Sequence, residues 1–158
     1  MSDYLELNAD KFKFRVATDR VYTTGGVWAF WMQVEQKNRV RVGLTDYLQQ
    51  HSGDVTFISV NPVGTKLNAG DDFAEFETIK TVLVLPSPVS GIVIEINPAI
   101  ELTPEIINQD SYGEGWLALI SPSNLEEDKQ YLMTAERYFE LMKSKIKDEL
   151  GKGSKKEV

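Results

Sequence analysis

The chain has 158 residues, no cysteine, one histidine and a net charge of −7 at pH 7. This length suits one domain that buries its own core, and the lack of cysteine excludes disulfides, a thiol catalyst and cysteine-ligated metals. The negative charge disfavours binding to nucleic acid or to anionic membrane surfaces, because their phosphates would be repelled.

The first half of the chain alternates apolar and polar residues, which is typical of half-buried strands. "KFKFRV" (11–16) predicts a strand that adds to the main sheet at its N-terminal side. "VWAFWMQVE" (27–35) and "RVRVGL" (39–44) lie on either side of the polar turn Gln36-Lys37-Asn38 and predict a β-hairpin. Further strands are predicted at 55–60, 73–77, 82–85, 91–97 and 115–120.

Two short helices are predicted between the strands. Thr45 can cap a helix in "TDYLQQH" (45–51), and Thr103 can cap a second helix whose first residue is Pro104. Many short strands with helices at their margins indicate a mainly β fold, either a sandwich or a barrel-like structure.

The chain changes character after residue 122. Ser123 and Glu126 match a capping box, and an amphipathic helix is predicted to end at Gly151. The apolar stripe of this helix consists of Tyr138, Phe139, Met142, Ile146 and Leu150. The expected organisation is one domain over 1–150, with a β core over about 20–122, a helical region over 123–150 and a flexible tail over 151–158.

Several separated motifs between Val40 and Pro122 carry a family resemblance. They are "VGLTDYLQ" (42–49), "ETIKT" (77–81), "PVSG" (88–91), "TPEIIN" (103–108) and "YGEGWL" (112–117). In this order they resemble VGITDYAQ, the lipoylation site ESVKA, PVSG, NPELVN and YGEGW of the glycine cleavage H protein family, the lipoyl carriers. The eleven steps from Lys80 to Gly91 also agree with the family. Motifs that agree in order and spacing are specific, and they imply the lipoyl-domain-like sandwich, or hammerhead, fold of H proteins.

The resemblance implies that Lys80 carries lipoic acid as an amide. A modified lysine has to lie at an exposed hairpin tip, within reach of a lipoate ligase or lipoyl transferase, with rigid strands on both sides. The attached dithiolane would accept two electrons or a thiol-linked group by exchange at sulfur. The other residues of the expected hairpin tip are Glu77, Thr78, Ile79 and Thr81.

Other kinds of site fit these residues less well. Considered alone, Lys80 could be an ordinary solvated lysine. Biotin carriers resemble one another in a Met-Lys-Met tip, whereas Lys80 lies between Ile79 and Thr81. The acidic residues between 71 and 77 could bind a hard cation, but alternation along a solvated strand explains them better, so no metal site is predicted. His51, the only histidine, fits a polar residue at a helix end.

Two positions depart from the family's usual pattern. Family members usually have a glutamate before the tryptophan that corresponds to Trp28, where this chain has Val27, and an aspartate four steps after the modified lysine, where it has Val84. In H proteins those carboxylates help to line the cleft for a cationic aminomethyl load. Val27 and Val84 are therefore expected to line a cleft that suits a neutral or anionic, sulfur-linked load. The alternative is that Val84 is simply buried in the hairpin and other carboxylates compensate.

The sequence thus predicts a carrier protein and not an enzyme. The favoured hypothesis is an H-like lipoate-binding protein that serves a heterodisulfide-reductase-like complex in sulfur oxidation. One alternative is a conventional H protein that carries the aminomethyl group between glycine decarboxylase and aminomethyltransferase, with dihydrolipoamide dehydrogenase as a further partner. Another is a non-lipoylated interaction module of the same fold. Without a signal peptide or a run of eighteen apolar residues, we expect a cytoplasmic protein with no membrane or nucleic-acid partner.

Overall fold

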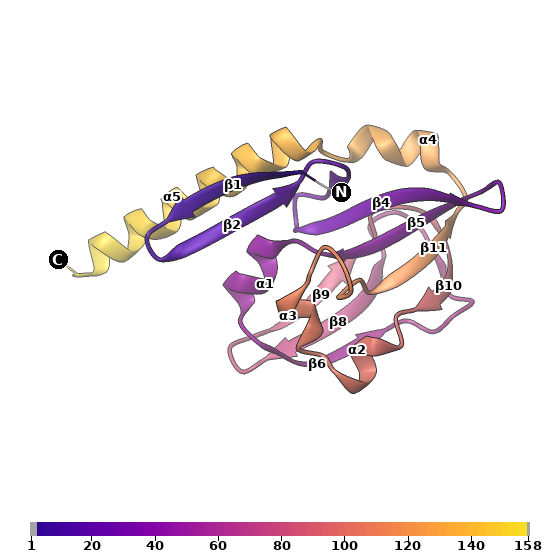
Figure 1. Ribbon diagram of the computed structural model, residues 1–158, viewed down its shortest axis with the longest axis horizontal. Coiled ribbons are helices and arrows are strands. Elements are labelled where there is room, and N and C mark those ends of the chain that lie inside the picture. The colour runs from indigo at the N-terminus through magenta and orange to yellow at the C-terminus, as the bar shows by residue number, and fades with distance from the viewer. Residues whose placement is uncertain (1–2, 158) are drawn as a thin grey trace.

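The structure is a computed structural model that describes residues 3–157, with side chains described up to residue 150. The strands are β1 (Tyr4–Ala9), β2 (Phe12–Ala17), β3 (Val21–Tyr22), β4 (Val27–Val34), β5 (Lys37–Leu44), β6 (Val55–Val60), β7 (Lys66–Leu67), β8 (Asp72–Thr78), β9 (Val82–Pro86), β10 (Gly91–Ile96) and β11 (Ala118–Pro122). The helices are α1 (Asp46–Ser52), α2 (Ala99–Leu102), α3 (Ile106–Gln109), α4 (Leu125–Asp128), the 3-10 turn η1 (Lys129–Tyr131) and α5 (Ala135–Glu157). The predicted mainly β fold with a C-terminal helix is confirmed (Figure 1).

The strands form three antiparallel sheets. One has six strands in the order β3-β4-β5-β11-β10-β7, one has the three strands β6-β8-β9, and one is the hairpin β1-β2. The six-stranded and three-stranded sheets share one hydrophobic core, which we call the main core. It includes Val40, Val42, Leu44, Phe73, Phe76, Leu85, Val93 and Ile120. Burial of each large apolar side chain contributes about 1.5 to 3 kcal/mol, so this core is a principal source of stability.

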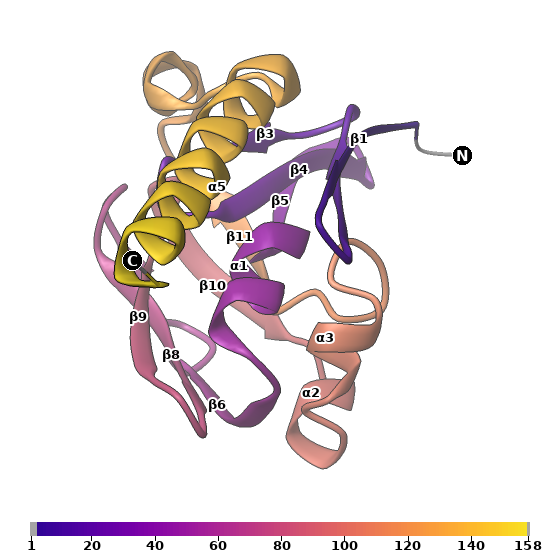
Figure 2. The same ribbon diagram turned by 90° about the vertical axis from the view of Figure 1, so that its left-hand side faces the viewer.

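A second core lies on the other side of β4, between that strand, the β1-β2 hairpin and α5. Figures 1 and 2 show α5 running along the hairpin. The buried side chains of this second core include Phe14, Val16, Tyr22, Trp28, Tyr47, Tyr112, Tyr138, Met142 and Ile146. The apolar stripe of the predicted C-terminal helix therefore does pack inward, although it packs on this second core and leaves Leu150 53% exposed.

The N-terminal segment differs from the sequence prediction. β2 pairs along its whole length with β1, from Tyr4 opposite Ala17 to Ala9 opposite Phe12, and does not join the six-stranded sheet. Asp10 has a φ of 57° at the turn between the two strands. Aspartate tolerates this left-handed conformation, which a tight hairpin turn requires. β2 therefore belongs to a separate two-stranded sheet whose buried side chains pack in the second core, and it is not an added strand of the main sheet.

The predicted helix caps are right in one case and wrong in two. The Thr45 hydroxyl accepts a hydrogen bond of 3.1 Å from the Leu48 backbone N–H, as expected for the cap of α1. α3 is instead preceded by Glu105, and α4 by Asn124, and neither residue makes a capping side-chain hydrogen bond. Thr103 therefore does not cap α3, and the capping box after residue 122 does not form.

The C-terminal boundary of α5 also differs from the prediction. The helix runs through Gly151 to Glu157. Glycine inside a helix costs only about 1 kcal/mol relative to alanine, which does not by itself end a helix. The predicted flexible tail is the segment 151–158, and its side chains lie outside the described part of the chain.

Candidate functional site

Lys80 lies at the tip of the β8–β9 hairpin. The backbone N–H of Thr78 donates a hydrogen bond of 2.9 Å to the carbonyl of Thr81, which closes a loop that contains only Ile79 and Lys80. Ile79 is 97% exposed, and Lys80 is also exposed. The lysine amine is therefore accessible to another protein, while antiparallel strands hold the backbone on both sides.

Thr78 fixes the backbone of this tip. Its side chain is buried, and its hydroxyl oxygen accepts hydrogen bonds from the backbone N–H groups of Lys80, at 3.2 Å, and Thr81, at 3.1 Å. Glu77 and Thr81 are half-buried beside it. The sequence placed Thr78 at the expected hairpin tip, and the structure shows that its side chain is buried beneath the loop, where the hydroxyl fixes the backbone.

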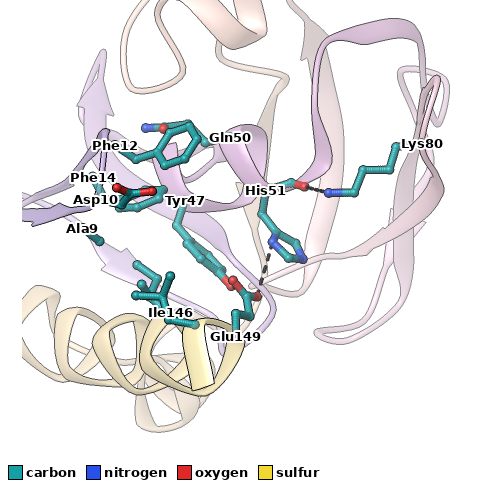
Figure 3. Close-up of a pocket in the computed structure, with 11 residues that line it drawn as sticks. Ala9, Asp10, Phe12, Phe14, Tyr47, Gln50, His51, Lys80, Ile146 and Glu149 are labelled. Carbon is teal, nitrogen blue, oxygen red and sulfur yellow. Dashed lines mark hydrogen bonds and ion pairs between the residues drawn. The ribbon is translucent and has the colours of Figure 1, made fainter. Parts of the chain in front are cut away.

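The side chain of Lys80 reaches back to the end of α1. Its Nζ donates a hydrogen bond of 2.8 Å to the backbone carbonyl of His51 (Figure 3). Carbonyl groups at the C-terminal end of a helix carry partial negative charge and attract a cation. The His51 ring stacks on Tyr47, with 5.5 Å between the ring centroids, and its Nδ1 lies 3.3 Å from Glu149 Oε1.

A cavity of about 260 Å³ lies next to Lys80, and we call it the Lys80 cleft. It is bounded by the β1–β2 turn, α1, the hairpin tip and α5, as Figure 3 shows. Its lining residues are Ala9, Asp10, Phe12, Phe14, Tyr47, Gln50, His51, Lys80, Ile146, Glu149 and Leu150. An exposed primary amine on a fixed tip, next to a partly apolar cleft, fits the attachment of a lipoyl group through an amide bond.

Most of the cleft could not be found from the sequence. The stripe of the C-terminal helix includes Ile146, but Glu149 and Phe12 carried no signal that would place them near Lys80. Tyr47 lies inside the "VGLTDYLQ" motif. The motif drew attention to this segment but did not indicate which distant residues Tyr47 would contact. Within the part of the chain that the structure describes, no group of three or more histidine and carboxylate side chains is arranged to hold a metal ion.

Val27 and Val84 do not line this cleft, and the prediction about them is wrong. Val27 is fully buried in the main core, where it lies opposite Leu44 on the neighbouring strand. Val84 is 47% exposed and lies opposite Glu75 on the three-stranded sheet. Val27 has no exposed surface and cannot contact a mobile arm, and Val84 is exposed but is not among the residues that line the cleft. The argument for a sulfur-linked load therefore loses its structural basis.

Comparison with known proteins decides the family. The model of the family described as "Glycine cleavage H-protein" matches residues 20–145 of this chain. The chain belongs to the glycine cleavage H-protein family. The match leaves the β1-β2 hairpin and the C-terminal end of α5 outside its bounds.

Individual H proteins support the same conclusion. A probable glycine cleavage system H protein of Thermococcus gammatolerans is 40% identical over 132 residues, which cover 84% of this chain and 96% of the relative. The H protein of Thermus thermophilus is 38% identical over 129 residues, which cover 82% and 97% of the two chains. A crystal structure of an H protein from Mycobacterium marinum superimposes with a TM-score of 0.66 at 33% identity, covering 77% of this chain and 94% of that one.

These comparisons correct the preferred functional hypothesis. The family match and the relatives are glycine cleavage H proteins, and none of them supports a sulfur-oxidation carrier or a heterodisulfide-reductase-like partner. The conventional alternative is therefore the better supported one. Among the described residues, no helix is both long and apolar enough to cross a membrane.

Proposed function

We propose that this protein is a lipoyl carrier of a glycine cleavage system, with lipoic acid attached to Lys80. The observation that carries the proposal is the position of Lys80, exposed at a two-residue hairpin tip in a chain of the H-protein family. In this role the protein carries an aminomethyl group between glycine decarboxylase and aminomethyltransferase, and it is a carrier and not a catalyst. A bound lipoyl group supplies a dithiolane that exchanges groups or electron pairs at sulfur.

The residues of the chain would position the arm. Thr78 holds the backbone on which the lysine stands, so the attachment point keeps one orientation toward partners. Amide formation removes the charge of the lysine nitrogen but leaves one N–H donor. The hydrogen bond from that nitrogen to the His51 carbonyl can therefore persist after modification.

Charge indicates how partners would dock. The net charge of −7 favours partner surfaces with basic residues, because complementary charge speeds encounter between proteins. The partners that the proposal implies are a lipoate ligase or lipoyl transferase, glycine decarboxylase, aminomethyltransferase and dihydrolipoamide dehydrogenase. A single carrier domain over residues 1–150 in the cytoplasm is part of the same proposal.

Reconstitution tests the proposal. Lipoylated protein is mixed with the glycine cleavage enzymes and with glycine labelled at its carboxyl carbon. This mixture should release labelled carbon dioxide. Lys80→Arg should reduce release to the level without carrier, whereas Lys66→Arg, at an exposed position on β7, should leave it unchanged. A fully lipoylated protein that gives no release above the carrier-free level would overturn the assignment.

A further inference from the structure

The two edges of the β1-β2 hairpin differ in how their backbone groups are used. On the β2 edge, the Arg15 N–H donates a hydrogen bond of 2.9 Å to Asp46 Oδ2, and the Arg15 carbonyl accepts one of 2.9 Å from the Tyr112 hydroxyl. The Lys13 carbonyl accepts one of 2.9 Å from Gln50 Nε2. Side chains of the domain therefore occupy this edge. In Figure 1, α1 and the two larger sheets lie on the β2 side of the hairpin, and β1 is its outer strand.

The β1 edge has no such hydrogen bonds. In an antiparallel pair, alternate residues direct their backbone groups away from the neighbouring strand. Arg15, whose backbone groups point outward, lies opposite Glu6. The outward positions of β1 are therefore Tyr4, Glu6 and Asn8, and no hydrogen bond among the described residues engages their backbone groups. β1 also contains no proline, lysine or bulge to protect its edge, so the edge is free to pair with another strand.

A groove follows this free edge and has α5 as its second wall. It encloses about 580 Å³ and is lined by Leu7, Asn8 and Ala9 of β1 and by one flank of α5. The polar residues of that flank are Glu140, Lys143, Ser144 and Lys147, and all four are exposed. A strand that pairs with β1 would therefore lie beside α5.

The charges along the groove fit a second copy of the same chain. The net charge of −7 opposes self-association, but the groove lining has two lysines and one glutamate. Glu140 and Lys147 lie about two turns apart on α5. A two-fold axis between them brings Glu140 of each copy to Lys147 of the other. Glu140 pairs with Lys143 of its own helix at 3.5 Å, whereas no ion pair among the described residues includes Lys147, which is free to bind the other copy.

The two β1 strands fit the same axis. A two-fold axis at Leu7 pairs them antiparallel, with Glu6 of one copy opposite Asn8 of the other and the two Leu7 residues opposite each other. An axis at Glu6 would place two carboxylates directly opposite each other, which is unfavourable. The axis at Leu7 avoids this repulsion and lies within the groove.

The spacing of such a pair also suits the helices. The centres of the two hairpins lie two strand spacings apart, roughly 10 Å. α5 contacts both strands of its own hairpin, so the two copies of α5 lie at about the same separation. Helices that pack against each other have axes about 8 to 10 Å apart. Strand pairing and helix packing can therefore form together.

We propose that β1 and the exposed flank of α5 form a two-fold interface between two copies of this chain. The hairpins join into a four-stranded antiparallel sheet, and the two α5 helices pack antiparallel on one face of it. The β1–β2 turns point in opposite directions. Because Lys80 lines the same cleft as the residues of that turn, the dimer presents its two hairpin-tip lysines at opposite ends. The interface does not depend on lipoylation.

Sedimentation equilibrium of the full-length, unmodified protein is the first test. Between about 1 μM and about 1 mM, the mass should rise from that of one chain to that of two. Glu6→Pro removes an outward N–H that the β1-β2 pairing does not use and should leave the protein monomeric. Glu6→Ala keeps this N–H and should dimerise like the parent. A parent that stays monomeric, or two variants that dimerise equally, overturns the proposal.

A cysteine cross-link tests the pairing independently of the proline variant. The chain has no cysteine of its own. Leu7→Cys places two thiols opposite each other at Cα atoms about 4.5 Å apart, which a disulfide can bridge. Oxidised glutathione should convert most of this variant to a covalent dimer. Asn8→Cys is the matched control, because Asn8 lies opposite Glu6, and it should cross-link about tenfold more slowly. Equal rates overturn the two-fold pairing.

A charge swap tests the contact between the helices. Glu140→Lys sets like charges against each other and should raise the dissociation constant of the dimer about tenfold. Adding Lys147→Glu to this variant should restore dimerisation. Glu136→Lys, at an exposed position of α5 outside the groove, is the matched control and should leave dimerisation unchanged. A double variant that dimerises no better than Glu140→Lys, or a control that weakens the dimer equally, overturns the interface and leaves the carrier function intact.

Discussion

The ring of Tyr138 in α5 stacks on the ring of Tyr22 in β3, with 4.7 Å between the centroids and 13° between the ring planes. Tyr138 also shares a hydrogen bond of 2.9 Å with the Thr45 hydroxyl, and the Tyr22 backbone N–H donates one of 2.9 Å to the carbonyl of Met133. These contacts tie the start of α5 to the edge of the six-stranded sheet. The helix is therefore part of the folded unit and not an appendage.

Met142→Ala tests this integration. Met142 is fully buried in the second core, and truncation of such a side chain costs about 2 to 5 kcal/mol of unfolding free energy. Urea denaturation should show this loss. Lys147→Ala, on the exposed face of the same helix, should change stability by no more than about 0.5 kcal/mol. A loss below about 1 kcal/mol for Met142→Ala would mean that α5 is a loosely attached docking element.

The hairpin tip should depend on Thr78. Thr78→Ala removes two hydrogen bonds, each worth about 0.5 to 1.5 kcal/mol, so the unfolding free energy should fall by about 1 to 3 kcal/mol. The rate of lipoylation should fall as well, because the loop that presents Lys80 is no longer fixed. Thr78→Ser keeps the hydroxyl and should keep most of both properties. Equal behaviour of the two variants would show that the hydroxyl does not organise the tip.

Stability should decline at alkaline pH because of buried tyrosines. Burial raises the pKa of Tyr138 to about 12, and it also raises the pKa of Tyr22, Tyr47 and Tyr112, with Glu149 contributing at Tyr47. In the unfolded chain each phenol ionises near pH 10, roughly the ordinary tyrosine value. The unfolded state then binds fewer protons than the folded state, so stability is constant below about pH 10 and falls as the pH rises toward the raised folded values.

Thermal unfolding followed from pH 8 to 12 checks this expectation. The melting temperature should drop above about pH 10, and the tyrosinate absorbance near 295 nm should rise partly in step with unfolding. Tyr22→Phe removes one ionisable phenol and should make the drop shallower. A melting temperature that falls equally steeply below pH 9 would point to other titrating groups.

The two valines should respond differently to an added carboxylate. Val27→Glu places a charge in the main core without a partner, which costs about 3 to 5 kcal/mol. Val84→Asp lies on an exposed strand face and should cost no more than about 1 kcal/mol. Denaturant unfolding of both variants distinguishes the positions. Similar stability in the two variants would contradict the buried placement of Val27.

Several elements could be predicted because their signals are local. Alternation along the strand predicted β4, β5, β6 and β8, and the threonine at position 45 predicted the start of α1. The turn of the β4–β5 hairpin lies one residue earlier than predicted, at Glu35 and Gln36, which have φ angles of 52° and 67°. The sequence offered no glycine there to mark the left-handed positions.

The second core and the cleft could not be predicted because they depend on contacts between distant segments. Tyr47 and Glu149 are separated by 102 positions, and nothing in the local pattern of either segment indicates the other. The layers that cover the two faces of β4 could not be predicted either. Trp28 faces the second core while Val27 and Ala29 face the main core, so the strand is buried on both sides and its alternation does not reveal which layer covers each face.

The most direct measurement of the central claim is the mass of the intact protein after incubation with lipoate ligase, ATP and lipoate, followed by peptide mapping. The account predicts the addition of one lipoyl group, located on Lys80, and no addition to Lys80→Arg. It also predicts that Lys80→Arg melts close to the parent temperature, since the side chain is exposed. A lipoyl group on any other lysine, or a correctly folded parent that remains unmodified, would contradict the account.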